Sequence, residues 1–118
     1  MSRSRIALSS FRIYINIWKA RWESLYTAIV EIEFDPAKDV ANLEKHGVSL
    51  AQVAKLEIVA VTDNSRPEEE ELRFRIYGFL GGEACCAVVT WREGRARAIS
   101  LRRANRMERK RYELQARD

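Results

Sequence analysis

Two segments of the sequence carry arginines in pairs, separated by one position. Arg73 and Arg75 alternate with apolar residues, and so do Arg95 and Arg97. Side chains two positions apart on a β-strand share one face of the sheet. A guanidinium group holds a phosphate through two parallel hydrogen bonds and keeps its charge at any physiological pH. Both pairs on one open face would form an anion-binding floor; the alternative is a solvated face on which they pair with the glutamates at 68–71.

A second candidate for chemistry is the single histidine of the chain, His46, which follows Lys45. Imidazole is the only side chain that titrates near neutrality without perturbation, so it can act as a general acid or base. The structural alternative is a helix C-terminal residue that interacts with the last backbone carbonyls. The residue types alone leave both roles open.

Local signals define the helix that carries these two residues. Asp35 can accept hydrogen bonds from free N–H groups of a first turn, and Pro36 suits the first helical position. Gly47 can adopt the left-handed conformation that ends a helix. These signals predict a helix over 36–46 and a second one over 50–56, which starts from Ser49.

The spacing within the first helix divides it into two sides. One side is polar, with residues at spacings of four and three, namely Lys38, Asn42 and Lys45. The other side is apolar, and we expect it to be buried through Ala37, Val40 and Ala41.

The remaining segments predict an α+β domain with a small antiparallel sheet of three to five strands. Strands are expected at 31–34, 58–62, 72–79, 84–91 and 95–101, with the helices on one side of the sheet. A basic C-terminal helix is expected from Asn105 to about residue 116.

Basic residues are concentrated near the C-terminus. Residues 92–111 contain nine lysines and arginines against two glutamates. We place Arg102 and Arg103 on the terminal helix, where they can follow a nucleic-acid backbone in a salt-sensitive manner. A solvated helix is the alternative.

Composition limits the class of protein. A chain of 118 residues fits one domain, and its net charge of +4 comes from residues 1–29, because 30–118 are neutral. Cys85 and Cys86 are adjacent in an apolar strand and are expected to be core thiols, with no disulfide framework, metal site or cofactor. No apolar run is long enough to span a membrane, so we expect a cytoplasmic protein.

Residues 1–29 form a leader of uncertain structure ahead of a domain at 30–118. An alternating segment is followed by one with helical spacing, and no Gly or Pro separates them. We interpret the leader as an upstream extension caused by a misplaced start site, with Val30 as the initiator; the alternative is a functional arm.

Two motifs resemble the BrnT family of toxins from bacterial type II toxin–antitoxin systems. The first is D-P-A-K-x-x-x-N-L-x-K-H-G-V-S from Asp35, and the second runs from L-R-F-R-I-Y-G through R-A-R-A-I-S-L-R-R-A to E-R-K-R-Y-E. Together they cover about 31–113. The resemblance implies a RelE-like, metal-independent endoribonuclease that inhibits translation and is neutralised by a BrnA-like antitoxin in a hetero-oligomer.

With RNA as the implied substrate, the candidate residues take roles. Arg73 and Arg97 would bind the phosphate, and Lys45 and His46 would transfer protons or stabilise transition-state charge. The further RNA-binding candidates are Lys38, Asn42, Arg75, Arg95, Arg102, Arg103 and Tyr112, the last with a stacking or structural role. The alternatives are a non-catalytic nucleic-acid-binding or regulatory module, or an inactive toxin copy, since Ala96 and Ala98 stand where the family has larger aliphatics.

Overall fold

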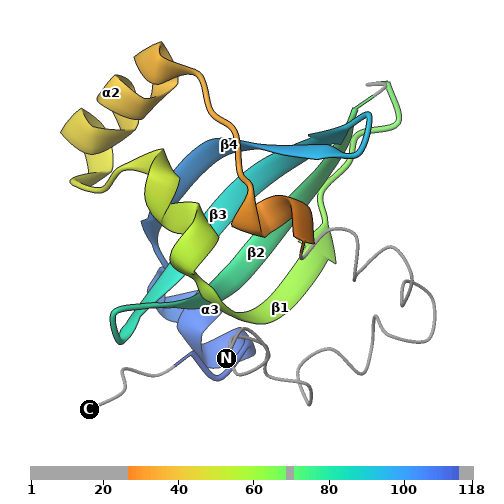
Figure 1. The fold of residues 1–118 in the computed structure, drawn as a ribbon. Coiled ribbons are helices and arrows are strands. Elements are labelled where there is room, and N and C mark those ends of the chain that lie inside the picture. Colours follow the sequence, from red (N-terminus) through yellow and green to blue (C-terminus); the bar gives the residue numbers. More distant parts are fainter. Residues whose placement is uncertain (1–26, 69–70, 115–118) are drawn as a thin grey trace.

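The structure is a computed structural model that describes residues 27–68 and 71–114. A four-stranded antiparallel sheet lies at its centre, with the strands side by side in chain order (Figure 1). The strands are β1 (Glu57–Asp63), β2 (Leu72–Leu80), β3 (Glu83–Arg92) and β4 (Arg95–Arg103). Helix α2 (Pro36–His46) and the 3-10 helix η3 (Leu50–Lys55) precede the sheet, and helix α3 (Arg106–Arg111) follows it. The predicted small α+β fold is confirmed.

The two faces of the sheet are covered by different elements. On the first face, strand residues such as Ile76 and Val89 pack against Leu50 and Val53 of η3 in the main core. The second face carries a smaller cluster that includes Tyr77. Figure 1 shows η3 in front of the sheet and α3 behind it. The prediction that all helices lie on one side is therefore wrong, because the second face has apolar residues that α3 and the chain after it must cover.

Helix α2 has the predicted bounds. The Asp35 side chain accepts a hydrogen bond of 2.9 Å from the backbone N–H of Ala37, and Pro36 occupies the first helical position. Gly47 has a φ of 75° and donates its N–H to the carbonyl of Leu43. A residue with a Cβ would be strained there, so the glycine fixes the end of the helix.

The orientation of α2 is the reverse of the predicted one. Ala37 and Ala41 are exposed, and the relative exposure is 56% for Val40 and 44% for Leu43. Asn42 is the buried residue of this helix. The expectation that the apolar side is buried was wrong, and hydrogen bonds explain why.

Polar side chains attach α2 to the rest of the domain. The amide of Asn42 donates to the carbonyls of Leu101 (2.9 Å) and Val48 (2.8 Å), and its oxygen accepts from the N–H of Leu101 (3.1 Å). The carboxylate of Asp39 accepts from the backbone N–H of Leu50 (2.7 Å) and the hydroxyl of Ser49 (2.9 Å). Leu101 lies on β4, at the edge of the sheet. Asn42 thus satisfies a strand edge that water or another chain would otherwise occupy.

Several predicted elements are shorter than expected. The strand at 31–34 is reduced to one bridge, in which Glu33 pairs with Arg97 of β4. Arg102 and Arg103 belong to β4 rather than to the terminal helix, which ends at Arg111. The predicted end of that helix, near residue 116, lies outside the described residues.

The leader is only partly described. Residues 27–30 form a helical turn, and residues 1–26 lie outside the described part. Ala28 and Ile29, which precede the predicted domain boundary at residue 30, are buried in the main core. The boundary and the origin of the leader stay predictions.

Candidate functional site

The strand register brings two of the predicted arginines onto one face. Arg73 of β2 pairs with Thr90 of β3, and Thr90 pairs with Arg97 of β4. Directly paired residues project to the same side of a sheet. Arg73, Thr90 and Arg97 therefore form a line across the second face, which we call the arginine row.

The spacing of the arginine row suits one phosphate. Adjacent strands lie about 4.8 Å apart, so the Cα atoms of Arg73 and Arg97 are roughly 10 Å apart. An extended arginine side chain covers more than half of that distance. The register therefore places the two arginines on either side of Thr90, which is 4% exposed, and of the two only Arg97 lines the neighbouring cleft.

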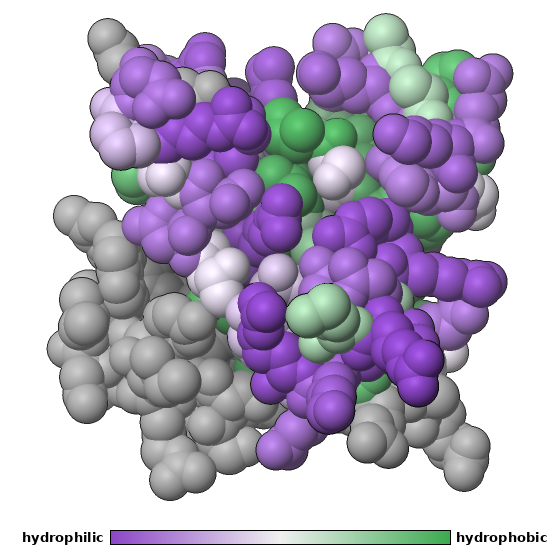
Figure 2. All heavy atoms as spheres, turned by 180° about the vertical axis from the view of Figure 1, so that it is seen from behind, coloured by the Kyte–Doolittle hydropathy of each residue, from purple (hydrophilic) through white to green (hydrophobic). Residues whose placement is uncertain are grey.

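A cleft of about 310 Å³ opens beside the row, between α2 and the β3–β4 hairpin. Thr90 and Arg97 line one end of it, and Lys38 of α2 lines it as well. The other lining residues are Glu33, Glu71, Arg92, Glu93, Arg95 and Ile99. Figure 2 shows this side of the molecule, where hydrophilic residues surround a hollow with a hydrophobic floor. The lining thus combines four basic residues with three glutamates and one apolar residue, Ile99.

Ion pairs neutralise part of the positive charge in the cleft. Arg95 pairs with Glu33 at 2.8 Å, and Arg92 pairs with Glu71. Arg97 and Lys38 make no ion pair with any other residue in 27–68 or 71–114. These two cations are the ones that the cleft can offer to an anionic ligand.

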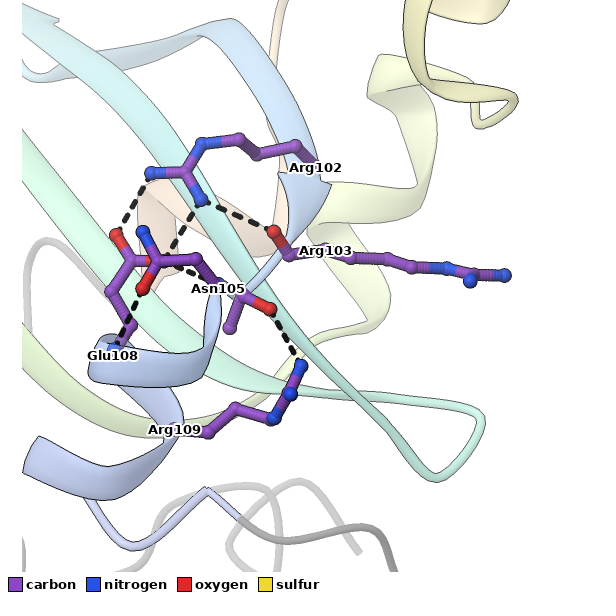
Figure 3. Close-up of polar contacts among 6 residues, drawn as sticks. Arg102, Arg103, Asn105, Glu108 and Arg109 are labelled. Carbon is purple, nitrogen blue, oxygen red and sulfur yellow. Dashed lines mark hydrogen bonds and ion pairs between the residues drawn. The ribbon is translucent and has the colours of Figure 1, made fainter.

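The opposite end of the same face is closed by α3 (Figure 3). The guanidinium of Arg102 donates two hydrogen bonds of 2.8 Å to the carboxylate of Glu108. Glu108 also accepts from the backbone N–H of Asn105, and the Asn105 side chain accepts from the N–H of Glu108, which completes a capping box. Arg102 is thus engaged in an ion pair with a glutamate of its own chain.

The bond from Arg102 also controls ionisation at this end. It is the main reason that the pKa of Glu108 lies below its ordinary value, although burial opposes the change. Burial raises the pKa of the Cys86 thiol to about 11, so this thiol is protonated at neutral pH. Cys85 is buried as well, which confirms that both cysteines are core residues.

Aromatic stacking covers the floor beneath α3. The rings of Tyr77 and Tyr112 stack with centroids 4.3 Å apart. Burial raises the pKa of the Tyr77 hydroxyl, and a hydrogen bond with Arg75 partly offsets this. In this structure, Tyr112 stacks on a residue of its own chain, which fits the structural role predicted for it. Arg75 lies between the open and the closed end of this face.

The remaining predicted residues are dispersed. Asn42 is buried and its amide is engaged by the protein, so it is not available to RNA. Arg103 pairs with Glu83 at 3.2 Å at the same end of the sheet as Arg102, but it projects to the first face, because its register partner Cys85 belongs to the main core. Lys45 and His46 do not line the cleft; they lie at the other end of α2, about 10–12 Å along the axis from Lys38.

Sequence reasoning missed two residues of the site. Thr90 was read as part of an apolar strand, and only its pairing with both arginines reveals its position. Glu108 is absent from the predicted site residues, although its six-residue separation from Arg102 could have suggested an ion pair.

Two structural searches complete the description. Within the described residues, no group of three or more His, Cys, Asp or Glu side chains is placed to hold a metal ion. In the same part of the chain, no helix has the length and apolar character needed to cross a membrane.

Comparison with known proteins gives one match. The family model described as the ribonuclease toxin BrnT of type II toxin–antitoxin systems matches residues 34–108. No curated protein and no solved structure matches this chain. The matched segment includes α2, the whole sheet and the start of α3, and thus the arginine row, the cleft and the Arg102–Glu108 pair.

Proposed function

The chain belongs to the BrnT family of ribonuclease toxins of type II toxin–antitoxin systems, and from this premise we propose that it cleaves RNA at the arginine row without a metal ion. The observation that carries the proposal is the register that aligns Arg73, Thr90 and Arg97 on one face. Had the two arginines projected to opposite faces, they could not have acted on the same phosphate.

RNA cleavage without a metal ion requires fixed positive charge close to the reacting phosphate. The ribose 2′-hydroxyl loses its proton to a base and its oxygen attacks the adjacent phosphorus, while negative charge accumulates on the phosphoryl oxygens. The bond between phosphorus and the 5′-oxygen then breaks, and the 5′-oxygen takes up a proton and leaves as a hydroxyl. Preorganised donors at that position typically contribute about 3 kcal/mol each to transition-state stabilisation. Arg73 and Arg97 would supply these donors, and the cleft would hold the neighbouring nucleotide beside Lys38.

The residues proposed to transfer protons lie outside the cleft. Lys45 and His46 stay our candidates, because His46 is the only imidazole of the chain. Their distance from Lys38 along α2 separates them from the cleft. We therefore expect His46→Ala to lower the cleavage rate less than Arg97→Ala does.

The family also implies a protein partner, since a type II system pairs its toxin with an antitoxin protein. We propose that this partner is BrnA-like and forms a hetero-oligomer with the chain, and that the free toxin inhibits translation in the cytoplasm.

Cleavage of a labelled RNA by the purified protein tests the proposal. We expect cleavage in EDTA and its loss in the double variant Arg73→Ala, Arg97→Ala. The matched control is Arg103→Ala, which removes an arginine from the same sheet at its closed end. Thermal unfolding of each variant checks the fold. Equal cleavage by the double variant and the wild type would overturn the proposal.

A further inference from the structure

Helix α2 has its amphipathic sides reversed relative to an ordinary surface helix. Most surface helices bury an apolar stripe and expose polar residues. In α2, the side facing the domain carries Asp39 and Asn42, and both form hydrogen bonds with it. The side facing solvent carries Val40 and Leu43, which are half exposed.

The exposed side is a continuous surface rather than scattered residues. Val40 and Leu43 are three positions apart, so they are neighbours on the helix. Ala37 and Ala41 extend the same surface and are also exposed, and one acidic residue, the exposed Glu44, lies among them. We call the four apolar residues the α2 apolar face. An exposed apolar surface with polar borders is typical of a protein interaction site.

We propose that the α2 apolar face is the docking surface for the antitoxin, through an apolar helix flanked by acidic residues. This rests on the proposed function, because the family supplies the partner class. The surface itself comes from the geometry of α2.

Charge at the borders supports an acidic partner. Lys38 and Lys45 are seven positions apart, so both exposed lysines lie along the same border of this face. Lys38 also lines the cleft together with Arg97. A partner seated on the α2 apolar face can therefore extend carboxylates over Lys38 towards Arg97, where they would take the place of RNA phosphates.

Other occupants fit the surface less well. RNA bases stack on aromatic rings or guanidinium planes, and the α2 apolar face contains no aromatic residue and no arginine. A second copy of the chain would bring the same two lysines to the border of a symmetric interface, where like charges repel.

The test uses the double variant Val40→Gln, Leu43→Gln, which keeps good helix formers on an exposed face. The control is Met107→Gln, because Met107 is 69% exposed on α3, away from α2. The probe is the purified product of the reading frame adjacent to that of this chain, and its affinity is measured by calorimetry. We expect the double variant to raise Kd at least tenfold, and the control to leave it unchanged. RNA cleavage by the double variant should equal that of the wild type.

The outcomes separate the docking surface from the catalytic proposal. A Kd unchanged in the double variant overturns the docking surface, and so does the absence of binding to the wild type. If the double variant cleaves RNA more slowly but keeps its Kd for the probe, the face binds RNA. If the wild type is a dimer and the double variant is a monomer, the face binds a second copy of the chain. Either result overturns the proposal. Wild-type protein that binds the probe through this face but does not cleave RNA would contradict the proposed function alone.

Discussion

The second face of the sheet uses arginine in opposite ways at its two ends. At the open end, Arg73 and Arg97 flank Thr90 beside a cleft. At the closed end, Arg102 is held by Glu108 of α3 and is only partly exposed. The difference teaches that the number of basic residues near the C-terminus says little about function. For Arg97 and Arg102, the presence of an acid of the same chain on the guanidinium distinguishes a structural arginine from a candidate binding one.

Breaking the Arg102–Glu108 ion pair at the closed end should cause the largest loss of stability. Glu108→Ala leaves the Arg102 guanidinium without its acid and removes half of a capping box, so we expect a loss of about 3 kcal/mol in the free energy of unfolding. Urea denaturation measures this value. The control is Glu83→Ala, since the exposed Glu83–Arg103 pair should contribute less than about 1 kcal/mol. Equal effects of the two variants would remove the distinction between the partly buried Arg102–Glu108 pair and the exposed Arg103–Glu83 pair.

The attachment of α2 provides the second comparison. Asn42→Ala removes three hydrogen bonds and leaves backbone groups of Leu101 without partners, so we expect a loss of about 2 kcal/mol. Lys38→Ala, one turn earlier on the same side of α2 but with an exposed side chain, should leave the stability unchanged and weaken RNA binding. Urea denaturation and a salt-dependent RNA binding assay separate these effects. If Asn42→Ala weakens RNA binding and leaves the stability unchanged, Asn42 would again be an RNA-binding candidate.

Acid should weaken the closed end selectively. The folded-state pKa of Glu108 lies below its ordinary value of 4.5, mainly because of Arg102. A lowered folded-state pKa stabilises the protein above the unfolded-state pKa, and this stability is lost as the pH falls through the folded-state pKa. The difference in unfolding free energy between wild type and Glu108→Gln should thus be largest near pH 7 and narrow below about pH 4.5. A difference that stays constant between pH 7 and pH 3 would contradict the assignment.

Local features of the fold could be predicted from the sequence. Asp35, Pro36 and Gly47 act through contacts within a few residues, and they fixed the bounds of α2 correctly. The alternation of Arg73 and Arg75 with apolar residues likewise identified a strand with one cationic face.

Features that depend on distant residues could not be predicted. The reversed orientation of α2 follows from Asn42 bonding to Leu101, which lies 59 positions away. Hydrophobic periodicity assumes that the apolar side is buried, and here polar contacts override it. The alignment of Arg73 with Arg97 through Thr90 depends on the registers of two hairpins, which a single strand pattern does not contain.

The central claim is that Arg73 and Arg97 act on one phosphodiester. A double-mutant cycle on RNA cleavage tests it most directly, with single-turnover rates for the wild type, Arg73→Ala, Arg97→Ala and the double variant. Because the two groups would stabilise the same transition state, each single variant should lose about 10²–10³-fold, and the double variant should lose clearly less than the product of the two. Strictly multiplicative losses, or a wild-type rate in either single variant, would contradict the claim.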